Sequence, residues 1–224
     1  MHAISKTLLL PFLAATALFA AGEEARLTAS TSVLSEVMDT PDRSIPQSLL
    51  DKSNCIVIVP GAKKAGFILG AKYGRGFASC RNKDGVGWSA PAAMRVEGGS
   101  FGLQIGVAET DVIMLVMNER GMDKLLSSKF TLGGDATAAA GPVGRNATAE
   151  TDALMRAEIL TWSRSRGLFA GVSLQGATLR EDSDVNKALY NKPLDNRTIL
   201  TTGVAAPTSA QALISLLNKY SGRK

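Results

Sequence analysis

Apolar residues occur along this chain in short unbroken runs, separated by glycines and by charged turns. The segment CIVIVP, residues 55–60, is apolar at every position and rich in β-branched residues, which predicts a strand buried on both faces. Residues 98–118, GGSFGLQIGVAETDVIMLVMN, hold two further apolar runs around a polar break and predict a hairpin. Apolar positions at helical spacing predict helices at 23–38 and 209–219, near both ends of the chain.

Glycines recur at intervals of four residues in three of the predicted strand segments. The positions are Gly66, Gly70 and Gly74, then Gly98, Gly102 and Gly106, then Gly167 and Gly171. Residues four apart on a strand lie on one face, so each segment has a face without side chains. Glycine weakens a strand interior, so its repeated use needs a structural reason. We interpret the bare face as serving packing, because it lets another backbone approach closely or lets the sheet coil sharply. A transmembrane GxxxG helix is the alternative, and the nearby lysines argue against it.

The remaining segments alternate short helices with turns and strands. The predictions are short helices at 45–52, 119–128 and 182–190, turns at Gly61 and Asp84-Gly85, extended structure at 130–145, and a polar connector at 191–207. Residues 151–166 fit a helix or a strand, and we favour a strand from Ala157 that turns at 166–167 into a partner strand. The whole pattern predicts a single α+β domain of mainly antiparallel glycine-rich strands, with helices at both ends and a few short helices between strands.

The first 22 residues have the composition of a secretory signal peptide. Lys6 supplies a positive start, residues 8–15 an apolar core, and Ala20 and Gly22 are small residues at the cleavage positions. An uncleaved anchor is the alternative, but the apolar core is shorter than the roughly 20 residues that span a bilayer. We therefore expect an exported chain, in the periplasm or outside the cell. The predicted divisions are a signal peptide at 1–22, a helical segment at 23–44, a main domain at 45–190, and a connector with a terminal helix at 191–224.

The helix at 23–38 has two interpretations. Its narrow apolar stripe predicts a helix that lies on the domain. An amphipathic segment that meets a membrane is the alternative, although its charged face is acidic.

Composition argues against several kinds of partner and chemistry. The formal net charge is +5, but the cations are scattered, and an aromatic content of 5% leaves few side chains for stacking on bases, so we expect no nucleic-acid binding. The one histidine, His2, lies in the predicted signal peptide, which leaves no Ser-His or Cys-His pair in the mature chain. Two cysteines cannot form a four-thiolate metal site and no phosphate-binding glycine loop is present, so we expect no metal and no cofactor.

Three acidic residues, Asp111, Asp135 and Glu158, are candidates for a catalytic carboxylate pair. The sequence sets no distance between them, so a structural role for each is the alternative. We expect a protein that is not an enzyme, and a carboxylate-dependent hydrolase is the competing hypothesis.

Cys55 and Cys80 fall in two neighbouring predicted strands. In an exported chain, a disulfide between them would close a loop of about 25 residues and add roughly 3 kcal/mol of stability. Two buried, unpaired thiols are the alternative.

Several cations lie in predicted turns. Lys63 and Lys64 lie between glycines, Arg145 follows a Gly-Pro-Val-Gly bend, and Arg164 and Arg166 lie at a hairpin. Each cation near an anionic bilayer contributes about 1 kcal/mol to the free energy of membrane binding. If these turns converge, they would give an attachment to the membrane that weakens as salt is added. Separate, solvated turns are the alternative.

Five segments in a fixed order resemble one known family. They are KKAGFILGAKYGRG, GWSAPAAMRVEGGSFGLQIG, DVIMLVMN, KFTLGGDATAAAGPVGR and SRSRGLFAGVSLQG. Over residues 45–190 the chain resembles the SYLF domain family of lipid-binding and actin-regulating proteins. The resemblance implies a single non-enzymatic module that binds phospholipids, phosphoinositides in eukaryotic members, and in some members binds actin.

In that family, basic residues and an N-terminal amphipathic segment are associated with membrane contact. The resemblance makes Lys63 and Lys64 the best candidates for lipid binding, with Arg145 and Arg166 as weaker ones. The predicted signal peptide and disulfide indicate an exported chain. Of the two activities that the resemblance implies, lipid binding is therefore expected of this chain more than actin binding. We therefore predict a phospholipid-binding module that contacts anionic lipid through basic turns. The alternative is a cell-envelope scaffold that binds a protein partner.

Overall fold

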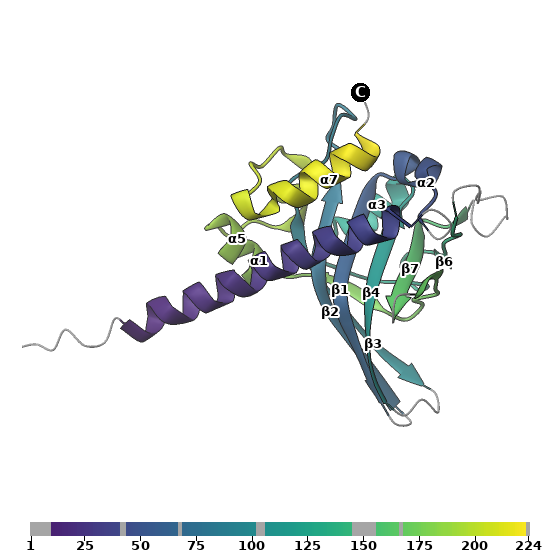
Figure 1. Cartoon of the computed structure of the whole chain (residues 1–224), viewed down its shortest axis with the longest axis horizontal. Coiled ribbons are helices and arrows are strands. Elements are labelled where there is room, and N and C mark those ends of the chain that lie inside the picture. The colour runs from purple at the N-terminus through teal and green to yellow at the C-terminus, as the bar shows by residue number, and fades with distance from the viewer. Residues whose placement is uncertain are drawn as a thin grey trace, which may run out of the picture.

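The computed structural model describes residues 10–40, 44–66, 69–101, 106–144, 156–165 and 168–222. Its strands are β1 (Cys55–Gly66), β2 (Leu69–Cys80), β3 (Ala92–Phe101), β4 (Gly106–Val116), β5 (Lys129–Thr131), β6 (Ala138–Ala140), β7 (Ile159–Ser165), β8 (Leu168–Gly171) and β9 (Thr178–Glu181). Its helices are α1 (Leu10–Met38), α2 (Gln47–Lys52), α3 (Glu119–Leu125), α5 (Ser183–Tyr190), α6 (Asn196–Thr201), α7 (Gln211–Ser221) and a 3-10 turn at Thr208–Ala210. The predicted α+β class, with helices near both ends, is confirmed (Figure 1).

The nine described strands form one sheet in the order β5-β9-β3-β2-β1-β4-β7-β6, with β8 paired to β7. Among the described pairs, only β6 with β7 is parallel. The two edge strands, β5 and β6, are joined by residues 132–137, and so short a segment spans at most about 20 Å. The sheet is therefore strongly curled and has an inner and an outer face.

The inner face holds one apolar core. Alternate strand residues point into it, among them Val57 of β1, Met114 of β4 and Leu179 of β9, which are all fully buried. Phe130 of β5 and Ile199 of α6 pack against them.

The outer face holds a second apolar core, which the helices cover. Ile56, Ile113 and Trp162 point outward and lie beneath α1 and α7, which cross this face in Figure 1. Leu27 and Leu34 of α1 are fully buried in the same core. The prediction that this helix lies on the domain is therefore confirmed, because burying these side chains supplies the free energy that holds the helix in place.

Helix α1 begins at Leu10, ahead of the predicted start at residue 23, and runs without a break through Gly22. Glu23, Leu27 and Leu34 are buried, so cleavage after Gly22 would leave the contacts of these side chains with the domain in place. That cleavage, and export with it, stay predictions. Among the described helices, none combines the length and the apolar character needed to cross a bilayer.

Strands β1 to β4 extend beyond the curled body as a four-stranded ribbon, at the bottom of Figure 1. In this ribbon Gly66 pairs with Gly70 and Gly106, and Gly98 pairs with Lys72. The glycines spaced by four therefore share one face of the ribbon, which continues the inner face of the sheet.

In the ribbon, Gly74 and Gly98 lie where another part of the chain comes close. A Cβ at Gly74 would lie 2.6 Å from Val59 Cγ1 and 2.9 Å from Ala62 Cβ, and one at Gly98 would lie 3.2 Å from the Cα of Ala177. The predicted packing role of the bare face is confirmed at these two positions. Gly102 and Gly167 lie outside the described residues.

The predicted hairpin at 98–118 is wrong. The chain does pass from β3 to β4, but β2 and β1 lie between these two strands in the sheet. The apolar pattern identifies strands, whereas pairing is decided by long-range register that no local pattern contains.

Two local predictions also need correction. Gly61 does not end a strand: β1 continues through it with a shift of register between Val59 and Ala62, and Gly61 takes a positive φ of 58°. The predicted connector at 191–207 contains helix α6, whose N-cap Asp195 accepts a hydrogen bond from the Thr198 N–H at 2.7 Å. Short capped helices carry little apolar periodicity, which is why the pattern missed this one.

Several local predictions are confirmed. Cys55 and Cys80 are directly opposite each other on β1 and β2 and form a disulfide. The turn at Asp84-Gly85 is present, and β7 and β8 pair as predicted on either side of 166–167, which lie outside the described residues.

Candidate functional site

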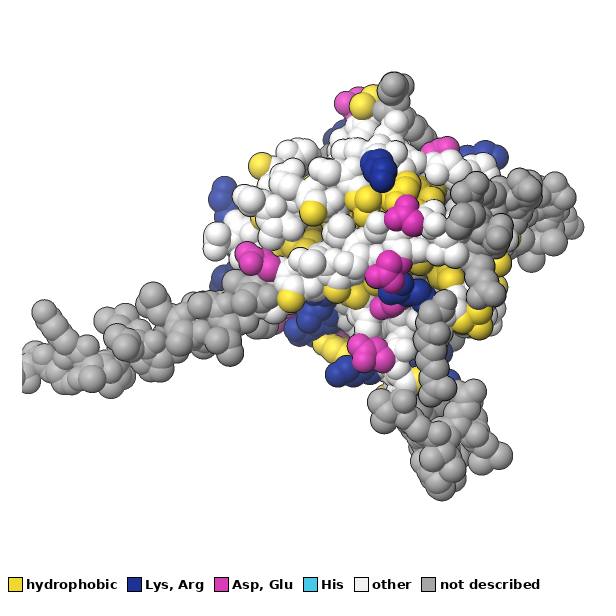
Figure 2. Space-filling model, in the orientation of Figure 1, with side chains coloured by type: hydrophobic (Ala, Val, Ile, Leu, Met, Phe, Trp, Pro, Cys, Tyr) yellow, Lys and Arg dark blue, Asp and Glu magenta, His cyan; other side chains and the backbone are white. Residues whose placement is uncertain are grey.

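A groove of about 730 Å³ lies between α1 and the outer face of β1, β2, β4 and β7. It is lined by four cations from four elements, which are Arg26 of α1, Lys63 of β1, Arg75 of β2 and Arg164 of β7. Figure 2 shows Lys and Arg side chains gathered below α1, where the ribbon leaves the body. The groove brings together residues that lie far apart in the chain, and its two ends differ in charge.

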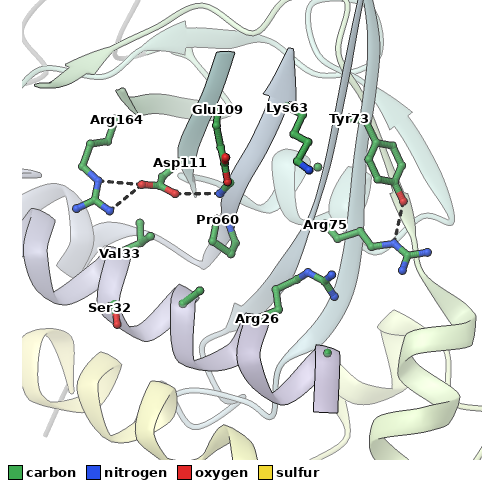
Figure 3. A pocket seen from close by; sticks show the side chains of 14 residues that line it. Arg26, Ser32, Val33, Pro60, Lys63, Tyr73, Arg75, Glu109, Asp111 and Arg164 are labelled. Atoms are coloured by element: carbon green, nitrogen blue, oxygen red, sulfur yellow. Dashed lines mark hydrogen bonds and ion pairs between the residues drawn. The ribbon is translucent and has the colours of Figure 1, made fainter. Parts of the chain in front are cut away.

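One end of the groove is a closed ion-pair network. Asp111 Oδ2 accepts hydrogen bonds from Arg164 Nε at 2.9 Å and from Arg164 Nη2 at 2.7 Å, and its Oδ1 accepts one from the Gly61 N–H at 2.9 Å (Figure 3). Glu36 of α1 forms a further ion pair with Arg164. Burial by itself would lower the pKa of the Arg164 guanidinium, but the hydrogen bonds to Asp111 and Glu36 outweigh it and raise that pKa. This end fastens α1 to the sheet.

The other end of the groove carries more positive charge. Arg26, Lys63 and Arg75 line this end from three elements, and Figure 3 shows Arg75 turned toward the hydroxyl of Tyr73. Arg26 is paired with Glu23, whose Oε1 also lies 4.0 Å from Arg75 Nη1. Arg75 Nε donates to the Tyr73 hydroxyl at 2.8 Å.

Among Arg26, Lys63 and Arg75, Lys63 is the side chain that can bind an incoming anion at the lowest free-energy cost. Within the described part of the chain, it makes no ion pair or hydrogen bond, and its side chain is exposed. It lies across the strand pairs from Tyr73 of β2 and Glu109 of β4. An anion here would be held by Lys63 without first breaking an ion pair of that side chain.

The predicted site residues separate in the structure. Lys63 lines the groove, but Lys64 lies on the opposite face of the ribbon, because successive residues of a strand point to opposite faces. Arg145 and Arg166 lie outside the described residues. Sequence reasoning missed Arg26 and Arg75, although the alternation of β2 places Arg75 on the same face as Tyr73, the partner of Lys63.

On the inner face of the ribbon, Lys64 of β1 lies directly across from Lys72 of β2. Burial lowers the pKa of the Lys72 ammonium, and the positive charge of Lys64 lowers it further. Like charges directly opposite each other on antiparallel strands destabilise the pairing of those strands. Lys64 and Lys72 therefore place two repelling positive charges on the face of the ribbon away from the groove.

We expect replacement of Lys64 by glutamine to raise the pKa of Lys72 and to slow acylation of its amine at about pH 9, because a smaller fraction would then be neutral. Peptide mass spectrometry after labelling with an amine-specific reagent measures this. Lys63→Gln, on the opposite face, is the matched control and should leave the labelling of Lys72 unchanged. Equal labelling of Lys72 in the wild-type and Lys64→Gln proteins would contradict the expectation.

The three candidate catalytic carboxylates do not share one site. Asp111 is in the groove, whereas Asp135 and Glu158 line a separate hollow of about 550 Å³ beside α3 and β5. Asp135 Oδ2 accepts from the Thr131 N–H at 2.8 Å, and Glu158 Oε2 accepts from the Thr137 N–H at 2.7 Å. Each carboxylate therefore has a structural role in the chain around it. In the described ranges, no group of three or more His, Cys, Asp and Glu side chains lies in an arrangement that could hold a metal ion.

The structure is thus a curled sheet with two apolar cores and a charged groove beneath a docked helix. The family model described as "Ysc84: Las17-binding protein actin regulator" matches residues 97–220. The chain belongs to this Ysc84 family, the SYLF family that the five sequence segments indicate.

The curated relatives include two proteins whose names record an SH3 domain. SH3 domain-containing YSC84-like protein 1 of Rattus norvegicus is 34% identical over 181 residues, which are 80% of this chain and 53% of its own length. An SH3 domain-containing protein of Schizosaccharomyces pombe is 37% identical over 177 residues, 78% of this chain and 41% of its own length. Protein YSC84 of Saccharomyces cerevisiae is 33% identical over 179 residues, 79% of this chain and 38% of its own length. The chain spans about half the length, or less, of these relatives. The family description and the two SH3-domain names indicate binding proteins rather than catalysts.

Proposed function

We propose that this protein is a non-enzymatic module that binds anionic phospholipids, and that the groove receives the headgroup phosphate. The observation that carries the proposal is the placement of Lys63, Arg26 and Arg75 around one open space, with Lys63 making no ion pair among the described residues. A phosphate favours such a cluster because its oxygens accept several charge-assisted hydrogen bonds at once.

Tyr73 supports a membrane surface rather than a free anion as the source of that phosphate. It lies at the groove beside Lys63 and Arg75, and it is 45% exposed, which is high for a large aromatic residue. Tyrosine is enriched at membrane interfaces, because its ring contacts the apolar boundary while its hydroxyl stays among the headgroups.

We expect Lys63→Glu to weaken binding to anionic vesicles about twentyfold, since it removes one positive charge and adds a negative one near the surface. Co-sedimentation with vesicles of equimolar phosphatidylcholine and phosphatidylglycerol at low salt measures this. Lys83→Glu is the matched control, because Lys83 is exposed in the turn that follows β2, at the end of the strand away from the ribbon.

Thermal unfolding of both variants checks that they fold equally well. Equal pelleting of the wild-type protein with neutral and anionic vesicles would contradict the proposal, and so would a failure to pellet with anionic vesicles at low salt. Added salt should release the bound protein, because it screens exposed charges.

A second candidate function is that of a scaffold that binds a protein partner. The family description, which names Las17 binding and actin regulation, favours it. If export occurs as predicted, the partner would be an envelope protein. Capture of a defined partner by a variant that has lost vesicle binding would favour this function over lipid attachment.

A further inference from the structure

The inner face of the ribbon carries two lysines that stand side by side. Lys64 of β1 and Lys72 of β2 are directly opposite each other, so their Cβ atoms lie about 5 Å apart. Both side chains are half-buried. Two ammonium groups held at this spacing can contact a single small anion together, and we call Lys64 and Lys72 the lysine pair.

The positions around the lysine pair on this face hold no side chain larger than a methyl group. Alternate residues of a strand share a face, and directly paired residues lie side by side on it. The neighbours along the two strands are Ala62, Gly66, Gly70 and Gly74, and the neighbours on the adjoining strands are Ala108 of β4 and Gly98 of β3. Among the described residues, the sheet therefore leaves room for a ligand beside both ammonium groups.

No carboxylate from the described residues of the ribbon shares this face. Glu97 and Glu109 belong to the ribbon, but each is next in sequence to an inner-face residue and so points to the outer face. Lys72 makes no hydrogen bond or ion pair with the described part of the chain. Burial and the charge of Lys64 lower the pKa of Lys72, and no described carboxylate raises it.

This arrangement costs the fold free energy. The half-buried ammonium of Lys72 loses hydration that no described partner replaces, and the like charge directly opposite adds repulsion. Two threonines, or a lysine opposite a glutamate, would pair the same strands without either cost. An anion that contacts both ammonium groups removes both costs through charge-assisted hydrogen bonds. An anionic ligand therefore explains the lysine pair better than the stability of the sheet does.

The place of the lysine pair favours a soluble anion over a membrane surface. The inner face is the concave face of the curled sheet, and a loop closes against it beside the pair. A Cβ at Gly98, directly across from Lys72, would lie 3.2 Å from the Cα of Ala177 and 3.4 Å from the carbonyl oxygen of Gly176. A flat bilayer does not reach into a concave face, whereas a small molecule does.

We propose that the lysine pair is an anion site on the inner face of the ribbon, and that it binds the phosphate group of a small soluble molecule. Phosphate suits the pair because its oxygens accept hydrogen bonds from both ammonium groups at once. The site is separate from the groove, because Lys63 and the groove lie on the opposite face of the ribbon. It does not depend on the proposed lipid binding, so each of the two is tested without the other.

Protection of Lys72 from acylation by inorganic phosphate tests the proposal in the full chain. An opposite charge within about 6 Å favours the ammonium form and raises the pKa of a lysine by about one unit or more. At about pH 9, labelling of Lys72 should therefore slow about tenfold in saturating phosphate, relative to sodium chloride of equal ionic strength. Peptide mass spectrometry measures the labelling, and Lys187, which is exposed on α5, is the reference that should not change.

Two alanine variants separate the site from a general effect of phosphate. Ala108→Leu should remove the protection without changing any charge, because the larger side chain fills the space beside Lys64. Ala71→Leu is the matched control, since Ala71 is likewise an exposed alanine of the ribbon but lies on the outer face. Lys63→Gln, which alters the groove, should also keep the protection. Circular dichroism checks that all three variants are folded.

Equal labelling of Lys72 in phosphate and in chloride would overturn the inference, and so would protection that Ala108→Leu leaves intact. Loss of protection in Lys63→Gln would mean that phosphate acts from the groove, which also overturns it. Vesicles of equimolar phosphatidylcholine and phosphatidylglycerol should leave the labelling of Lys72 unchanged. Protection by these vesicles without protection by inorganic phosphate would assign the lysine pair to a bilayer and contradict a soluble ligand.

Discussion

Replacing Gly76 with alanine should abolish most of the stability of the protein. A Cβ at this position would lie 2.0 Å from the carbonyl oxygen of Ile58 and 2.7 Å from the Cα of Val59. Both obstacles are backbone atoms of β1, which cannot move aside without breaking its pairing with β2 and β4. We expect a loss of about 4 kcal/mol or more, a large part of the 5–15 kcal/mol that keeps a domain folded.

Urea unfolding followed by circular dichroism measures this loss. Gly134→Ala is the matched control, because the nearest atom to a Cβ at Gly134 is Thr131 Cβ at 3.7 Å, an ordinary contact. The control should change the free energy of unfolding by about 1 kcal/mol at most. Equal stability of the two variants would show that β1 and β2 do not approach each other as closely as described.

Loss of the disulfide should produce the second large effect. The bond between Cys55 and Cys80 closes a loop with a sequence separation of 25, and both residues are fully buried. Removing it frees the unfolded chain and should cost about 3 kcal/mol, in a protein of this size a fall in Tm of about 6–12 °C.

The double variant Cys55→Ala and Cys80→Ala measures this cost by thermal unfolding. A reductant should lower the Tm of the wild type, once its thiols are shown to be free, and should leave the Tm of the variant unchanged. An unchanged Tm in the double variant would mean that the closed loop adds no stability.

Local sequence patterns determined much of the fold. The β-branched run at 55–60 became the centre of the sheet, the segment after Asp182 became α5, and the two cysteines met as predicted. These features depend on side chains within a few residues of each other, or on a single pairing between neighbouring strands. The glycine spacing likewise predicted where backbones approach, because a missing side chain has the same consequence in any sheet.

Local patterns failed where the answer depended on distant segments. The apolar runs at 98–118 predicted two strands correctly, but they could not show that β1 and β2 would insert between them. The bulge at Gly61 was read as a turn, because a positive φ satisfies either structure.

The candidate site divides in the same way. The sequence was sufficient to place the chain in its family, to locate its strands and to select Lys63 as a cation of interest. Only the tertiary structure separated Lys63 from Lys64 and placed Arg26 and Arg75 beside Lys63. The physical reason is that strand identity follows from local residue chemistry, whereas register and curl, which decide which charges meet, follow from the packing of the whole sheet.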